Sequence, residues 1–103
     1  DLAQSLHLIN SDTIQNILTT SNGRAVQMAR DKSKDDRTHI TELYLLTMSR
    51  QPTQEELDTA LAHLAKKRQQ SASKKQTEEQ AVKEAYEDII WVVINTKEFL
   101  FNH

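Results

Sequence analysis

The 103-residue chain contains no cysteine, one glycine and one proline. Without cysteine this segment has no disulfide, no thiolate metal ligand, no cysteine nucleophile and no attachment point for covalently bound haem. A sheet of several short strands would need more turn residues than one glycine and one proline supply. The sequence therefore favours a fold built from helices.

An excess of charge of one sign and long apolar runs are also lacking. Thirteen basic and fifteen acidic residues give a formal net charge of −2. Such a chain has no overall attraction to nucleic acid or anionic lipid, so we expect no nucleic-acid binding. No apolar run approaches the roughly 20 residues of a membrane-spanning helix, so we expect no direct membrane insertion.

Aromatic residues are few, and four of the five lie between Ala85 and Phe101. This stretch (AYEDIIWVVINTKEFLF) contains an apolar run around Trp91. Good helix formers and the capping-box pattern that begins at Thr77 precede it, so we predict one helix over residues 78–97. The run is apolar on nearly all sides, which places this helix at the centre of the fold. We expect Trp91 and its neighbours to be largely buried and Ile90→Ala to be strongly destabilising.

Helical spacing of apolar residues predicts further helices along the chain. We expect a single all-α domain, residues 1–103, that forms a compact bundle of about five helices, the first of them interrupted. The expected helical ranges are 2–9, 12–21, 24–31, 36–49, 54–69 and 78–97.

Local signals place the ends of these helices. Gly23 suits the left-handed position after a helix end, and Asp35 or Asp36 suits an N-cap. Thr53 begins a second capping-box pattern. Residues 69–76 contain no apolar side chain except an alanine, so we expect a mobile loop there.

The four histidines, His7, His39, His63 and His103, do not have the spacing of metal ligands. No two of them lie three or four residues apart. His39 and Glu42 form an H-x-x-E pattern, but a metal site needs three or four converging ligands, so we interpret them as a surface pair. We expect no metal and no other cofactor.

Acidic pairs are frequent, and most lie where a helix N-terminus favours negative charge. Asp88 instead adjoins the apolar run, and we interpret it as the exposed edge of its helix. His7, Asp88 and Asn95 remain open as residues that line a site shared with another domain. No nucleophile elbow, P-loop or H-E-x-x-H motif is present, so we expect no catalytic residue in this segment.

Basic residues gather near residues 66–75, where they could contact phosphates, and residues 41–64 could be drawn as a helix–turn–helix. The acidic net charge and the absence of a turn glycine favour a solvated helix end and loop instead.

Three large apolar residues, Phe99, Leu100 and Phe101, lie close to the end of the chain. Leaving them in water would cost roughly 1.5–3 kcal/mol each. They either fold back on the apolar residues of 2–9 or form a candidate interaction surface for another domain or subunit. Truncation after Lys97 would separate the two hypotheses.

Three stretches carry a family resemblance: residues 2–11 (LAQSLHLINS), Glu42 to Leu57 around LYLLTMSRQPT, and residues 95–103 (NTKEFLFNH). Together they resemble the C-terminal end of the large planctomycete proteins that carry a cytochrome-c-like domain and domains of unknown function. The resemblance covers nearly the whole chain. It implies a bacterial, extracytoplasmic setting, with haem carried elsewhere in the protein. It assigns no reaction, so no catalytic residue follows from it.

The chain begins at Asp1 without a methionine, and we expect it to be a C-terminal fragment of a larger protein. Our first hypothesis is a non-catalytic helical module that completes the fold of an envelope protein or provides a docking surface in it. Its partners would be upstream domains of the same protein or another protein. The alternative is a contribution to an enzymatic or electron-transfer site formed with those upstream domains.

Overall fold

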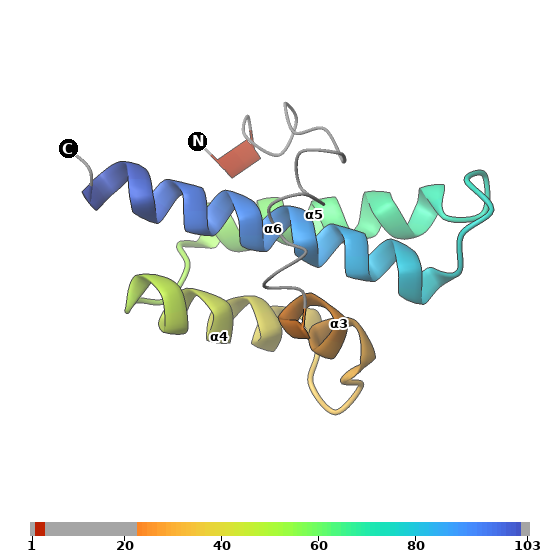
Figure 1. Ribbon diagram of the computed structural model, residues 1–103, viewed down its shortest axis with the longest axis horizontal. Coiled ribbons are helices and arrows are strands. Elements are labelled where there is room, and N and C mark those ends of the chain that lie inside the picture. Colours follow the sequence, from red (N-terminus) through yellow and green to blue (C-terminus); the bar gives the residue numbers. More distant parts are fainter. Residues whose placement is uncertain (1, 4–22, 102–103) are drawn as a thin grey trace.

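The computed structural model describes residues 2–3 and 23–101, with side chains through Thr96 (Figure 1). The helices are α3 (Gly23–Arg30), α4 (Asp36–Met48), α5 (Gln54–Gln70) and α6 (Glu78–Phe101). All regular structure in the described residues is helical, so the all-α prediction is confirmed, with these four helices rather than about five. Apart from the helical residues 2–3, the helices expected over 2–9 and 12–21 lie outside the described residues.

The helix starts follow the capping signals of the sequence. The Asp35 side chain accepts a hydrogen bond from the Thr38 amide at 2.8 Å at the start of α4. Thr53 and Glu56 form the reciprocal capping box of α5. The Thr77 hydroxyl accepts from the Gln80 amide, and the Gln80 side chain accepts from the Thr77 amide. Local hydrogen bonds therefore fix these starts, as the sequence predicts.

Gly23 does not occupy a left-handed position, so that prediction is wrong. Gly23 is the first residue of α3, and its φ is not positive. Glycine is most costly in a helix interior, so the first turn tolerates it. The left-handed residue after a described helix is Ser49, with φ 56°, directly after α4. No glycine is available there, so a small polar residue adopts the conformation.

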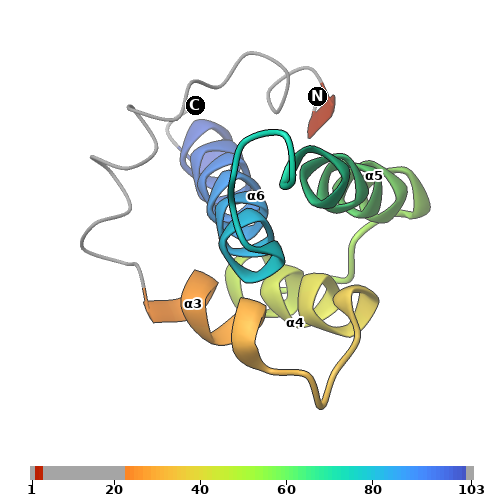
Figure 2. The same ribbon diagram turned by 90° about the vertical axis from the view of Figure 1, so that its right-hand side faces the viewer.

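The C-terminal helix α6 is central, and Figure 2 shows it between α5 and α3 with α4 beneath it. It packs against all three other helices. Its buried side chains include Tyr86 and Ile89, which are fully buried, and Ile90, which is 3% exposed. Burial is not complete around the helix, because Trp91 is only partly buried and Ile94 is 37% exposed. The prediction of an all-round buried run is therefore wrong at these two positions, which lie on one side of the helix.

The link between α5 and α6 begins later than predicted, because α5 continues through Gln70. The link is a series of turns in which the Gln76 amide donates to the Ser71 carbonyl at 2.9 Å. Lys75 is left-handed there, with φ 56°. The side chains of the link are largely exposed, as the polar composition of residues 71–76 predicts. None of the helices in the part of the chain described here combines the length and apolar character that crossing a bilayer requires.

We expect backbone amides of residues 71–76 to exchange with solvent within minutes, because few apolar contacts hold the link. Amides of residues 86–93 in α6 should exchange only through global unfolding. Hydrogen exchange followed by NMR checks both sets in one sample. Protection of the link equal to that of α6 would show that the link is docked on the fold.

Candidate functional site

The α5–α6 contact contains a polar cluster that the sequence did not reveal. His63 Nε2 lies 2.7 Å from Asp88 Oδ2, and Lys67 Nζ lies 3.6 Å from the same oxygen. Glu84 joins them, 3.9 Å from Lys67 Nζ. Residues four apart share a helix face, so these two α5 residues meet two α6 residues across the antiparallel pair. We call these four residues the seam cluster.

Asp88 is 7% exposed, so its interpretation as the exposed edge of a helix is wrong. A buried carboxylate needs partners, and His63 and Lys67 supply them. The neighbouring Glu87 is also buried, with Lys83 Nζ at 3.9 Å. Its burial raises the pKa of the Glu87 carboxyl above its ordinary value. Both acids therefore belong to the interior of the fold.

A second network joins three helices. The Tyr86 hydroxyl donates to Asp36 at the start of α4, and Asp36 Oδ2 lies 2.8 Å from Arg68 Nη2 on α5. Burial, and then the hydrogen bond to Asp36, raises the pKa of Tyr86 above its ordinary value. Tyr86 therefore stays protonated and serves as a donor. The network orients α4 and α5 against the central helix.

His39 does not form a surface pair with Glu42, so that interpretation is wrong. His39 is buried, its Nε2 lies 3.0 Å from the Asp31 carbonyl oxygen, and its ring contacts the Tyr86 ring edge-on with centroids 5.8 Å apart. Glu42 instead pairs with Lys34 at 3.1 Å. Their spacing brings the two residues to one side of α4, but only His39 is buried, with partners in the link after α3 and on α6.

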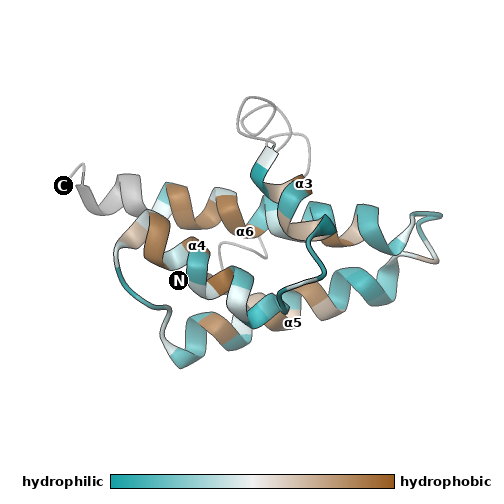
Figure 3. Cartoon of the chain, turned by 90° about the horizontal axis from the view of Figure 1, so that it is seen from below, coloured by the Kyte–Doolittle hydropathy of each residue, from teal (hydrophilic) through white to brown (hydrophobic). Residues whose placement is uncertain are grey.

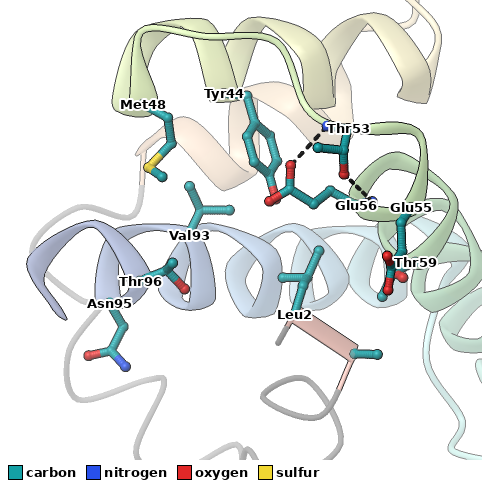
Figure 4. A pocket seen from close by; sticks show the side chains of 11 residues that line it. Leu2, Tyr44, Met48, Thr53, Glu55, Glu56, Thr59, Val93, Asn95 and Thr96 are labelled. Carbon is teal, nitrogen blue, oxygen red and sulfur yellow. Dashed lines mark hydrogen bonds between the residues drawn. The ribbon is translucent and has the colours of Figure 1, made fainter. Parts of the chain in front are cut away.

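An open cleft of about 510 Å³ lies between the C-terminal half of α4, the start of α5, and α6 (Figure 4). Its lining combines apolar and polar side chains: Leu2, Ala3, Tyr44, Met48, Thr53, Glu55, Glu56, Thr59, Val93, Asn95 and Thr96. In the close-up the Tyr44 ring points toward the Glu56 side chain, while Asn95 lies at the rim and points away from them. The cleft is thus a hollow with an aromatic wall and a polar edge.

The Glu56 carboxylate in the cleft already has hydrogen-bond partners within the fold. Glu56 accepts hydrogen bonds from Arg50 Nη1 at 2.9 Å, Arg50 Nη2 at 3.1 Å and the Thr53 amide at 2.8 Å. The Arg50 guanidinium, with the Thr53 bonds, lowers the pKa of Glu56. The same guanidinium lies 5.5 Å from the centre of the Tyr44 ring. Burial and then the Glu56 charge raise the pKa of Tyr44 to about 12, so its hydroxyl stays neutral.

The structure does not gather the predicted candidates into one site. Asn95 lines the cleft, whereas Asp88 belongs to the seam cluster. Phe99, Leu100 and Phe101 continue α6, but their side chains lie outside the described residues, as does His7. Both hypotheses about that tail therefore stay predictions.

The polar contacts of His63, Tyr44 and Tyr86 were not predicted from the sequence. One sequence signal could have indicated the contact of His63. His63 and Lys67 on one helix, and Glu84 and Asp88 on the next, repeat complementary charge at a spacing of four residues.

Within the described ranges, no group of three or more histidine, aspartate or glutamate side chains is placed to hold a metal ion. His63 and Asp88 provide two candidate ligands and bond each other. Comparison with protein families, curated proteins and solved structures finds no match to this chain.

Proposed function

We propose that the chain is a non-catalytic helical module of a larger bacterial envelope protein and that it docks against another domain of the same polypeptide. The use of its polar side chains supports this proposal. His63, Asp88, Tyr86 and Asp36 bond across helices, and such bonds hold a scaffold together. None of these four residues lines the cleft between α4, α5 and α6, where a substrate could reach it.

The observation that carries the proposal is a pair of exposed leucines on α4. Leu45 is 48% exposed and Leu46 is 58% exposed, although Leu43 and Tyr44 beside them are buried. Figure 3 shows hydrophobic residues gathered in the C-terminal half of this helix. Large contiguous apolar surface marks interaction sites, and these two adjacent side chains are the most exposed large aliphatic residues among those that the structure describes. We call these two residues the leucine pair. The leucine pair is a second candidate interaction surface, in addition to the tail residues 99–101.

The resemblance to planctomycete proteins with a cytochrome-c-like domain supports the proposed setting. The resemblance implies a larger protein outside the cytoplasm with its haem in another domain, and we adopt both as part of the proposal. Part of the resembling segment, LYLLTMSRQPT, contains the leucine pair itself. A surface within one of the three resembling stretches is consistent with a contact that the larger protein uses.

The double change Leu45→Asp and Leu46→Asp tests the proposed contact. We expect the free energy of unfolding of the isolated chain to fall by only about 1 kcal/mol per position, because about half of each side chain is exposed. In the larger protein the module should detach and become sensitive to limited proteolysis. The change Ala62→Asp with Ala65→Asp, at exposed positions of α5, is the matched control. If both double variants leave the module equally resistant, the leucine pair is not the contact.

A second candidate function is a contribution to an enzymatic or electron-transfer site formed with another domain. The cleft favours it, because Asn95 and Glu55 are exposed at its edge, where a second domain could meet them. In the larger protein, Asn95→Ala would then reduce activity without changing the stability of the module. Unchanged activity would leave docking as the better account.

A further inference from the structure

We propose that the cleft between α4, α5 and α6 binds a small organic amine, as a primary ammonium carried on a short apolar body. This inference goes beyond the docking role, since the cleft and the leucine pair have no residue in common. It rests on the size of the cleft, its walls and its charge.

The size and walls suit a small molecule. The volume of about 510 Å³ falls within the range of small-ligand sites, roughly 300–1,000 Å³. The Tyr44 ring, Met48, Val93 and Leu2 supply apolar surface on three sides. Such walls fit an aliphatic or aromatic body, whose transfer from water favours binding.

The charge of the cleft selects a cation. Glu55 and Glu56 are the charged residues of the lining, and Arg50 offsets Glu56 through its two hydrogen bonds. Glu55 is exposed in the first turn of α5 and has no ion pair among the residues that the structure describes, so it leaves one negative charge at the edge of the cleft. The neutral Tyr44 hydroxyl adds no charge. An ammonium at the mouth would therefore pair with Glu55 while its apolar body lies against the partly exposed side chains of Met48 and Leu2.

Titration of the chain with hexylammonium, followed by backbone amide NMR shifts, tests this site. We expect saturable shifts at Tyr44, Thr59 and Thr96, weaker binding of 1-hexanol and weakest binding of hexanoate. Glu55→Gln should weaken hexylammonium binding about two- to fivefold, the effect of one exposed ion pair. Asp58→Asn removes an equal charge from α5 outside the lining and should leave binding unchanged.

A parallel titration with Nα-acetyl-lysine methylamide, which mimics a lysine side chain of a partner protein, shows whether the cleft prefers such a lysine or a free amine. Tighter binding of hexylammonium supports the small molecule. Tighter binding of the lysine derivative keeps the ammonium but overturns the small-molecule source. Three results overturn the site itself: no saturable shifts at the cleft, hexanoate binding as tightly as hexylammonium, or equal losses in Glu55→Gln and Asp58→Asn.

Discussion

Ile90→Ala is expected to lower the free energy of unfolding by about 2–5 kcal/mol, the largest effect of any single change considered for this chain. Ile90 is 3% exposed and lies in the central helix, in the same cluster as Ile40 and Leu43 of α4. Truncation removes apolar surface from the core and leaves a cavity that packed neighbours fill only in part. Urea unfolding followed by circular dichroism measures the change.

Ile94→Ala is the matched control, because it makes the same truncation one turn later on the same helix. Ile94 is 37% exposed, so its loss should cost about 1–2 kcal/mol, less than the loss at Ile90. Equal losses at the two positions would contradict the placement of Ile90 in the centre of the fold. A wild-type midpoint for Ile90→Ala would contradict the central role of α6.

Asp88→Ala is expected to lower the free energy of unfolding by about 3 kcal/mol. The change leaves His63 and Lys67 at the α5–α6 contact without the carboxylate that both of them approach. Removing one partner of a buried ion pair costs about 3–5 kcal/mol, and the remaining contact of Lys67 with Glu84 places this case at the low end. Thermal or urea unfolding at neutral pH measures the loss.

Glu84→Ala is the control within the seam cluster. Glu84 is more exposed and lies 3.9 Å from Lys67, so its loss should cost less than about 1 kcal/mol. A double-mutant cycle on His63 and Asp88 isolates their coupling, which we expect at about 1–3 kcal/mol. Zero coupling would mean that the 2.7 Å contact contributes nothing to the stability of the fold.

The local part of this structure could be predicted from the sequence. The absence of turn residues indicated helices, and the side chains of Asp35, Thr53 and Thr77 marked helix starts because each bonds to an amide within three residues. Capping is a property of a few consecutive residues, so one sequence suffices to detect it. The central place of α6 followed from its apolar run.

The pairing of side chains across helices could not be predicted. Asp88 looks solvent-facing in its own helix, and only the approach of α5 buries it against His63. His39 is similar, because its partners are Asp31 in the link after α3 and Tyr86 on α6, neither of which is in its own helix. Helical spacing gives the face of a residue but not the neighbour that the face will meet. The cleft depends on the relative placement of three helices, which helical spacing does not give, so it could not be predicted from the sequence either.

An experimental structure of the proposed larger protein, with this chain in place, tests the central claim most directly. We expect the leucine pair to be buried against another domain, and the bond between His63 and Asp88 to lie within the module, away from any substrate or haem. The account is contradicted if Leu45 and Leu46 face water while Asp88 or Asn95 contacts a cofactor or substrate held by a neighbouring domain. The chain would then contribute to a reaction rather than to assembly.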